Sequence, residues 1–268
     1  MGRLHFFEFH DLPRCPRICR DSLTAFLGVV INRLGVYDVV IPQIKVLLEQ
    51  AEGDKVIDLC SGGGGPWERL ASSLEKEVGR PIHVLLTDKY PNCDSLAKIG
   101  TDSKTKIEFV AESVDATEVP KHLGGIRTLF SSFHHFRPPV ARHILTDAAK
   151  KGAPIGVFEF TERTILGTLG MLFAPFLALI MVPFFRPFSI KRLLWCVPFP
   201  FLPLMITWDG LVSNLRSYTT KELDELVSEI DAPDYHWESG RIWQGLIKPP
   251  VTFLIGYPIQ KDSSRHEN

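Results

Sequence analysis

The sequence predicts an α/β fold of the doubly wound type, in which helices cover a mainly parallel sheet. Three observations support this prediction. Short β-rich runs alternate with helix-like segments along most of the 268 residues. A glycine-rich turn joins the first predicted strand to the helix after it, and the second predicted strand ends at an acidic residue. This alternation is typical of parallel sheets built from strand–helix–strand units.

The glycine-rich turn follows a strand at Val56–Leu59 and contains four consecutive glycines, Gly62 to Gly65. Glycine has no Cβ and tolerates positive φ, so the backbone of such a turn can approach a ligand closely. Pro66 is suited to open the next helix and Gly79 to end it. The acid within the strand, Asp58, would repel a pyrophosphate but suits a ligand that carries a cationic amino group.

The second strand is predicted at Ile82–Thr87 and ends at Asp88. An acid there can accept hydrogen bonds from both ribose hydroxyls of a nucleoside. Asp88 lies about 24 residues after Gly64, close to the roughly 20 expected of that arrangement. A dinucleotide turn of the form G-x-G-x-x-G would need its third glycine where Trp67 stands. These features favour S-adenosylmethionine over NAD; NAD and a plain turn without a ligand remain as alternatives.

The remaining elements continue the alternation. In chain order they are strands at 106–111, 126–133 and 154–160, a helix at 138–151 between the last two, and final strands at 235–243 and 251–259. Residues Thr219 to Glu222 form a capping box that opens a helix ending near Ile230. No helix separates the last two strands, so they are predicted to pair antiparallel.

The N-terminal residues 1–53 are predicted to form a helical cover. Apolar residues recur at helical spacing between Ser22 and Gln50. Phe6, Phe7 and Phe9 are expected to add to the same cover. Packing in the core is the alternative role for each of these side chains.

With these elements in place, the chain resembles the class I S-adenosylmethionine-dependent methyltransferases of the small-molecule type, over roughly residues 54–160. The segment Leu129–Phe136 looks like the fourth-strand motif of these enzymes. It does not match the Asn/Asp-Pro-Pro-aromatic motif of amino-methylating nucleic-acid enzymes. The resemblance implies a Rossmann-like sheet of seven strands in the order 3-2-1-4-5-7-6, with the last strand antiparallel. It also implies S-adenosyl-L-methionine as the cofactor.

Matched residue by residue, the resemblance assigns cofactor contacts to several positions. They are Asp58, Gly62 and Gly64 in the first motif, Asp88 at the ribose, Asp115 and Ala116 near the adenine, and Ser131 in the fourth-strand motif. The family often has glycine where this chain has Cys60. Because cysteine has a Cβ and glycine has none, this difference affects the shape that the glycine-rich turn can adopt.

Methyl transfer is an in-line displacement at a sulfonium methyl, so an enzyme must align donor and acceptor, exclude water and sometimes remove a proton. His134 and His135 follow a strand whose end should face the cofactor. Either imidazole could act as the base, or it could only shape the pocket. Glu159, Glu162 and Arg163 end the fifth strand, and Glu159 is the third candidate catalytic residue beside the two histidines. They are predicted to bind a polar part of the acceptor or to form ion pairs that fasten the next segment.

An apolar segment, residues 164–208, interrupts the predicted domain. Residues 164–185 and 193–208 carry no charge, and Arg186, Lys191 and Arg192 lie between them. The leading interpretation is a hairpin that lies in the membrane interface, with these cations at the lipid headgroups. A double span and a soluble lid or dimer face remain as alternatives.

The chain returns from this segment at Trp208–Gly210, which is predicted to be a turn or a helix cap. Asp209 is also considered as a second acidic site residue. The predicted organisation is then as follows: a cover at 1–53, a methyltransferase domain at 54–163 and 209–260, a membrane-associating insertion at 164–208, and a flexible tail at 261–268.

Composition limits the partners. The formal net charge of −1 gives no strong basic field, so nucleic acid is not expected. The five cysteines are scattered without metal-type pairing, which predicts a reducing compartment and no metal. Residues 1–20 lack the apolar run of a signal peptide. The expected location is the cytoplasmic side of a membrane, peripheral or monotopic, with a soluble cytoplasmic protein as the alternative. The oligomeric state is open.

The sequence therefore predicts an S-adenosylmethionine-dependent methyltransferase that acts on a small or lipid-like acceptor at or near a membrane surface. The alternatives are a catalytically silent, nucleoside-binding membrane scaffold and a nicotinamide-dependent oxidoreductase.

Overall fold

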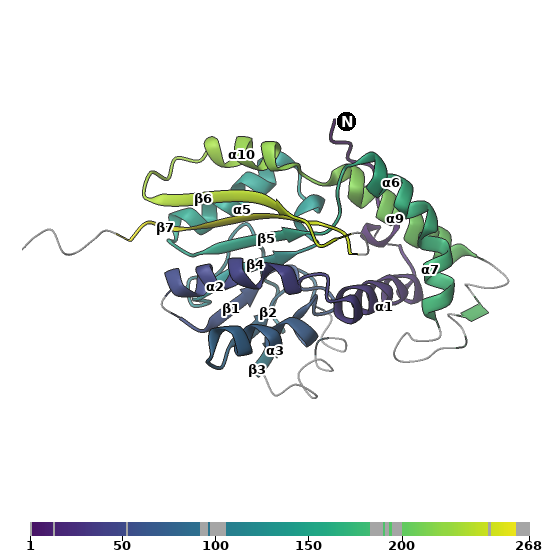
Figure 1. Cartoon of the computed structure of the whole chain (residues 1–268), viewed down its shortest axis with the longest axis horizontal. Helices are drawn as coiled ribbons and strands as arrows, with labels where there is room; N and C mark the ends of the chain where they lie inside the picture. The colour runs from purple at the N-terminus through teal and green to yellow at the C-terminus, as the bar shows by residue number, and fades with distance from the viewer. Residues whose placement is uncertain are drawn as a thin grey trace, which may run out of the picture.

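The computed structural model describes residues 2–12, 14–51, 53–91, 96, 106–182, 190, 193–194, 200–245 and 248–260. Their centre is one sheet of seven strands in the order β3-β2-β1-β4-β5-β7-β6 (Figure 1). The strands are β1 (Lys55–Asp58), β2 (His83–Leu86), β3 (Lys106–Phe109), β4 (Ile126–Phe130), β5 (Ile155–Glu159), β6 (Tyr235–Ile242) and β7 (Val251–Pro258). Strands β1 to β5 run parallel, and β7 runs antiparallel to β5 and β6. The predicted fold class and strand order are confirmed.

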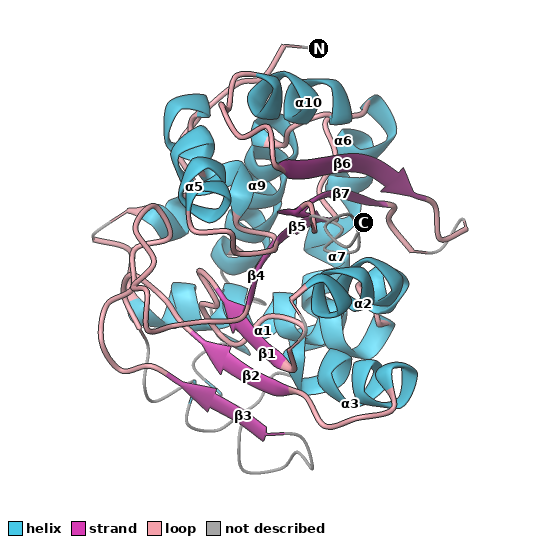
Figure 2. Cartoon of the chain, turned by 90° about the vertical axis from the view of Figure 1, so that its left-hand side faces the viewer, coloured by secondary structure: helices cyan, strands magenta, loops and turns pink. Residues whose placement is uncertain are grey.

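Helices cover both faces of the sheet (Figure 2). On one face α2 (Ile41–Gln50) and α3 (Trp67–Val78) pack against the strands around a core that includes Ile44 and Trp67. On the other face α5 (Pro138–Lys150) and α10 (Thr220–Ser228) enclose a second core. The central strands β4 and β5 are buried along their whole length, as expected for strands covered on both faces.

Helix ends follow the predicted signals. Gly79 ends α3 in the left-handed conformation, with φ of 74°. The capping box of α10 is present: the Glu222 backbone N–H donates to Thr219 Oγ1 at 3.3 Å, and the Thr219 N–H donates to Glu222 Oε2 at 2.8 Å. The left-handed glycine marks the end of α3, and the capping box marks the start of α10.

The apolar segment contributes α6 (Ile165–Gly170), the short helix η4 (Met171–Phe173), α7 (Ala174–Met181) and α9 (Phe201–Arg216). Helices α7 and α9 pack on each other and on α1 (Arg17–Leu34), at one end of the molecule (Figure 1). Their shared core includes Phe26 of α1, Ala178 of α7 and Leu202 of α9. The segment therefore extends the N-terminal cover.

Two expectations for this segment have different outcomes. The turn or cap predicted at Trp208–Gly210 is wrong, because α9 continues through these residues to Arg216. The cations Arg186, Lys191 and Arg192 lie outside the described residues. Among the helices that are described, none is by itself long and apolar enough to cross a membrane; one bent pair, Arg17–Leu34 with Asp38–Gln50, passes that test jointly.

Residues 2–12, which we call the N-terminal strap, lie along α9. The Leu4 backbone N–H donates to the Leu215 carbonyl at 3.0 Å. The Trp208 indole N–H donates to the Phe7 carbonyl at 3.0 Å. Asp209 accepts hydrogen bonds from the strap at the backbone N–H of Phe9, at 2.7 Å. The buried carboxylate of Asp209 thus holds the N-terminal strap by hydrogen bonds and does not form a turn.

Candidate functional site

A cavity of about 1660 Å³ opens at the carboxyl ends of the central parallel strands. In a doubly wound sheet this is the edge where ligands bind. Its lining comes from the glycine-rich turn, the loops after β2 to β4, helices α1, α3 and α5, and the strap. The cavity exceeds the roughly 300–1,000 Å³ typical of a single small-molecule site. The volume is large enough for more than one small molecule.

The glycine-rich turn forms one wall. Gly62, Gly64 and Gly65 have φ of 52°, 98° and 55°, conformations that side chains rarely adopt. A Cβ at Gly63 would collide with the Thr24 side chain of α1. The glycines are therefore required both by backbone conformation and by the close approach of the cover.

Cys60 also has a left-handed backbone, with φ of 57°. A residue with a Cβ costs about 1–2 kcal/mol in this conformation. This explains why glycine suits the position in the family that the chain resembles. The turn keeps its shape with cysteine present, at the cost of local strain.

Asp88 lies at the end of β2 and lines the cavity. Its carboxylate accepts hydrogen bonds from the Gly62 N–H at 2.9 Å and from the Tyr90 N–H at 2.8 Å. These contacts hold the acid against the glycine-rich turn. The two features that the sequence placed in one nucleoside site are therefore neighbours.

Asp115 and Ala116 follow β3 and line the same part of the cavity. Asp115 pairs with Lys89 at 2.7 Å and accepts a hydrogen bond from the Thr117 N–H at 2.9 Å. The Lys89 ammonium and Thr117 lower the pKa of Asp115 to about 2. The acid is thus ionised and able to accept a hydrogen bond from an amino group.

Ser131 follows β4, lines the cavity and has a positive φ of 46°. Its hydroxyl lies 2.5 Å from the hydroxyl of buried Tyr37, which donates to the Phe158 carbonyl at 3.2 Å. Either hydroxyl can be the donor in the contact between Ser131 and Tyr37. This pair fixes a strained residue at the cavity wall.

Asp58 lies behind the glycine-rich turn and does not line the cavity. Only 2% of it is exposed, and Thr128 Oγ1 donates to its Oδ1 at 2.7 Å. Burial raises the pKa of Asp58 to about 6. Its Oδ2 is 3.9 Å from where a Cβ of Gly65 would stand, so the carboxylate of Asp58 faces the turn and not the cavity.

The three candidate catalytic residues occupy different places. His135 lines the cavity, whereas His134 and Glu159 are buried outside it. His134 Nδ1 lies 2.8 Å from Glu159 Oε2, and Glu159 Oε1 accepts from the Phe133 N–H at 2.7 Å. The buried pair holds the short helix η3 (Phe133–His135) against β5. It therefore positions the loop that carries His135.

Glu162 and Arg163 form ion pairs away from the cavity. Glu162 pairs with Arg241 at 2.5 Å, and Arg163 pairs with Glu222 at 2.6 Å. Two roles were predicted for these residues, binding of a polar part of the acceptor or formation of ion pairs. The contacts agree with the second role.

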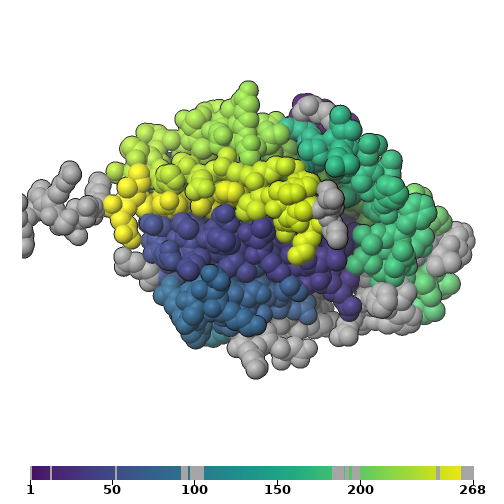
Figure 3. All heavy atoms as spheres, in the orientation of Figure 1, coloured from purple at the N-terminus to yellow at the C-terminus, as the bar shows by residue number. Residues whose placement is uncertain are grey.

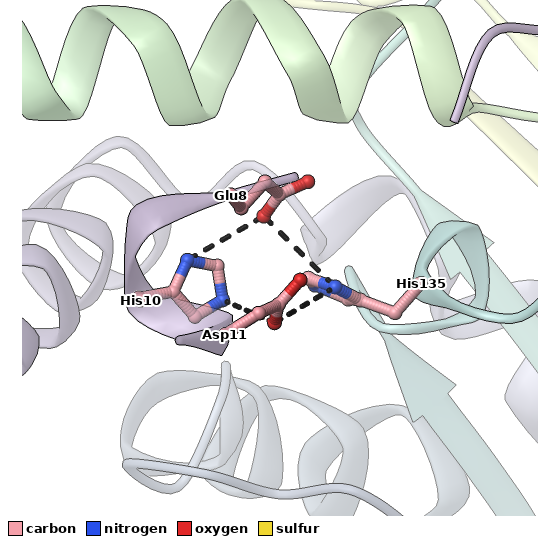
Figure 4. Close-up of side chains that lie close together, drawn as sticks. All are labelled: Glu8, His10, Asp11 and His135. Carbon is pink, nitrogen blue, oxygen red and sulfur yellow. Dashed lines mark ion pairs between the residues drawn. The ribbon is translucent and has the colours of Figure 1, made fainter. Parts of the chain in front are cut away.

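The strap adds residues that the sequence did not indicate. Its His10 and Asp11 line the cavity, and its buried Glu8 lies beside them, all close to His135 (Figure 4). More than 120 residues separate His135 from the strap. No spacing rule connects such distant residues; only the packing of the strap along α9 brings them together.

No protein-family model matches the sequence, and no curated protein matches it. Solved structures do match. The pyocyanin biosynthetic protein PhzM has a TM-score of 0.51 and 14% identity over 94% of this chain and 62% of its own. The CMeT domain of the citrinin polyketide synthase has a TM-score of 0.50 and 12% identity, with 85% and 55% covered.

An O-methyltransferase family protein from Burkholderia thailandensis has a TM-score of 0.44 and 18% identity, with 84% of this chain and 57% of its own chain covered. The present chain thus spans 55–62% of the length of these three proteins. At such low identity the likeness concerns the fold.

Proposed function

We propose that this protein is a methyltransferase that uses S-adenosylmethionine and acts on a small or lipid-like acceptor. The observation that carries the proposal is the arrangement of Asp88, Asp115 and the glycine-rich turn around one end of one cavity. Asp88 would accept the ribose hydroxyls, and the Gly62–Gly64 backbone would lie beside the aminoacyl end. Asp115 and the Ala116 backbone would hold the adenine.

When bound, the cofactor supplies an electrophilic methyl group on sulfur. The protein then has to align the acceptor with that methyl and keep water away. The acceptor fits the other end of the cavity, beside His135 and under the strap residues His10 and Asp11. We assign His135 the role of contacting the acceptor atom; His134 and Glu159 position it from behind.

The alternative functions are a nicotinamide-dependent enzyme and a silent nucleoside-binding scaffold. A nicotinamide enzyme would need close helix–strand packing where Trp67 is fully buried against Phe130, at a ring distance of 5.6 Å. A silent nucleoside-binding scaffold would share the pocket without turnover. Calorimetric binding of adenosylhomocysteine but not of NADH would exclude the nicotinamide enzyme. Detection of a methylated product would exclude the silent scaffold.

The decisive test is the affinity for adenosylhomocysteine. Asp88→Ala removes a charge-assisted, two-oxygen contact worth about 1.5–3 kcal/mol, so affinity should fall about ten- to a hundred-fold. Asp231→Ala, an exposed acid outside the cavity lining, is the matched control. Equal affinities for the parent and Asp88→Ala would remove the proposed cofactor site.

The finer part of the proposal is that the protein works at a lipid surface. Helices α6 and α7 with η4 present large apolar side chains that are between 42 and 77% exposed. They are Ile165, Leu166, Leu169, Leu172, Phe173, Phe176, Leu177 and Ile180. Residues 164–182 carry no charge, and these helices form one end of the molecular surface (Figure 3).

A bilayer surface suits this apolar face because a protein that stays in water seldom leaves so many neighbouring apolar side chains exposed. Exposed Phe6 and Phe7 of the strap continue the face, and Phe7 packs on Trp208 at a ring distance of 5.5 Å. Aromatic rings of this kind favour the membrane interface. The sequence adds Arg186, Lys191 and Arg192 between α7 and α9 as expected contacts for anionic headgroups.

A further inference from the structure

We propose that Glu8, His10, Asp11 and His135 bind one divalent transition-metal ion, with Zn²⁺ as the best match. Imidazole nitrogens with carboxylate oxygens are a common donor set for Zn²⁺, usually in four-coordinate sites. The site lies at the part of the cavity wall that the strap and His135 form. It goes beyond the function proposed above.

The four side chains form a closed ring (Figure 4). Glu8 Oε2 lies 3.4 Å from His10 Nδ1 and 3.9 Å from His135 Nδ1. Asp11 Oδ1 lies 3.5 Å from His10 Nε2 and 3.5 Å from His135 Nδ1. A tetrahedral ion with bonds of about 2.1 Å keeps its ligand atoms about 3.4 Å apart. Glu8 and Asp11 approach opposite nitrogens of His10, of which only one can bind the ion. One ligand atom from each of the four residues lies within 4.8 Å of the others, so the side chains close in on the ion when it binds.

Two further residues hold the ligands in place. Asp209 Oδ2 lies 3.0 Å from His10 Nδ1, which leaves His10 Nε2 to face the ion. Arg216 Nη1 donates to Glu8 Oε1 and to Asp11 Oδ2, both at 2.9 Å. The second oxygen of each carboxylate, Glu8 Oε2 and Asp11 Oδ1, is thereby turned toward the ring. Carboxylates behind histidines and partners behind carboxylates are typical of metal sites.

Glu8 supplies the independent observation. Its side chain is 0% exposed, and its Oε2 accepts no hydrogen bond from the described part of the chain. The nearest cationic atoms to this oxygen are His10 Nδ1 at 3.4 Å and His135 Nδ1 at 3.9 Å, both beyond hydrogen-bond distance or geometry. Burying a carboxylate oxygen without a hydrogen bond is costly, and an ion in the ring would supply the close partner. The carboxylates of Glu8 and Asp11 both pair with the Arg216 guanidinium, and the carboxylate of Asp209 lies beside His10.

One contact has to change when the ion binds. Arg216 Nη1 lies 3.1 Å from His135 Nδ1, and the ion would take that nitrogen. The guanidinium keeps its two carboxylate contacts, so the change is local. His135 then serves as a ligand at the cavity wall.

The site also suggests a class of acceptor, and this step rests on the proposed methyltransferase function. Since His10, Asp11 and His135 all line the cavity, an open coordination position would face it. A divalent ion there favours acceptors that carry a hydroxyl or carboxylate oxygen. Acceptors without such an oxygen gain nothing from the ion.

The test is calorimetric titration of chelator-treated, full-length protein with ZnCl₂, without any cofactor. The parent should bind one ion per chain. Asp11→Asn, at a partly exposed position, should lower the affinity at least about tenfold, and His10→Gln should do the same. Asp21→Asn, another acid of the cavity lining that lies outside the ring, is the control and should bind like the parent.

A second readout is thermal stability, because an ion that binds only the folded protein raises the melting temperature. ZnCl₂ should stabilise the parent and Asp21→Asn but neither ring variant. Absence of saturable binding up to about 1 mM, or equal affinity in the parent and Asp11→Asn, overturns the ion site. Adenosylhomocysteine titrated into the same metal-free protein reports separately on the proposed function, so either proposal can fail alone.

Discussion

At the residue scale, strained backbone conformations lie at the cavity wall. Among the described residues, Cys60 and Ser131 are the non-glycine positions with positive φ, and both line it. Such conformations cost of order 1–3 kcal/mol and persist where the surroundings enforce them. Tyr37 enforces the one at Ser131 through the hydroxyl contact. The cavity wall is therefore rigid before any ligand arrives.

Asp58 gives a prediction on pH. Burial raises its pKa to about 6, so the folded protein holds this proton more tightly than the unfolded chain does. The free energy of unfolding should then fall as pH rises from about 4 to about 6, by about 3 kcal/mol for this group. Asp58→Asn cannot titrate and should lose that part of the decline. Urea unfolding of both proteins between pH 4 and 8 measures the difference.

The exposed acid Asp231 is the control, since Asp231→Asn should follow the parent at every pH. If the Asp58→Asn and parent curves stay parallel from pH 4 to 8, the carboxyl of Asp58 is not raised in pKa and the ionised form is present throughout.

Residues at strand ends could be predicted from the sequence, and residues brought by long-range packing could not. Asp88 ends a strand whose carboxyl end must lie at the binding edge of the sheet, so the pattern predicted it; Asp115 was predicted through the resemblance to the methyltransferase family. Glu8 and Asp11 lie in a short segment without periodicity. Their partner His135 was identified, but its neighbours depend on where the strap packs.

At the element scale, α9 shows why the predicted turn failed. Trp208-Asp209-Gly210 has the composition of a turn, yet each residue has a packing role inside the helix. A Cβ at Gly210 would stand 2.6 Å from Met171 Sδ, so glycine permits the contact between α9 and η4. Tertiary contacts here outweigh the local preference of glycine.

The strap should depend on Asp209. Asp209→Ala leaves the backbone N–H groups of Phe9 and His10 without their acceptor, at about 1–3 kcal/mol each. We expect the strap to detach and trypsin to cleave after exposed Arg14, as mass spectrometry would detect. Adenosylhomocysteine affinity should change by less than about threefold, because the glycine-rich turn lies at the other end of the cavity.

Asp209→Asn retains one side-chain oxygen and should show intermediate protection. A strap that resists trypsin equally in Asp209→Ala and in the parent would mean that the contacts of Trp208 and Arg216 hold it without Asp209.

At the scale of the whole molecule, the sheet and both helical layers were predictable because alternating strands and helices allow few topologies. That pattern did not predict where the apolar segment, residues 164–208, would lie. Its composition fits a membrane hairpin and a soluble lid alike. The structure packs one side of α7 and α9 on α1 and leaves the other side exposed.

Vesicle binding tests that exposed side. Phe173 and Phe176 are 71% and 64% exposed, and burying each in lipid contributes about 1.5–3 kcal/mol. Replacing both with serine should lower partitioning to phosphatidylglycerol vesicles at least about tenfold. Trp243→Ser, a comparably exposed aromatic position outside this face, should leave it unchanged. Sedimentation without vesicles for the parent protein would exclude the lipid surface and favour the lid.

The placement of the strap also sets an order for biosynthesis. Phe9 and its acceptor Asp209 are 200 residues apart, and the ribosome makes the strap first. At about 5–20 residues per second, some 10–40 seconds pass before α9 emerges. During that interval Phe6, Phe7 and Phe9 have no partner on α9 and stay in contact with solvent. The wall of the cavity that His10 and Asp11 contribute can form only after α9 has been made.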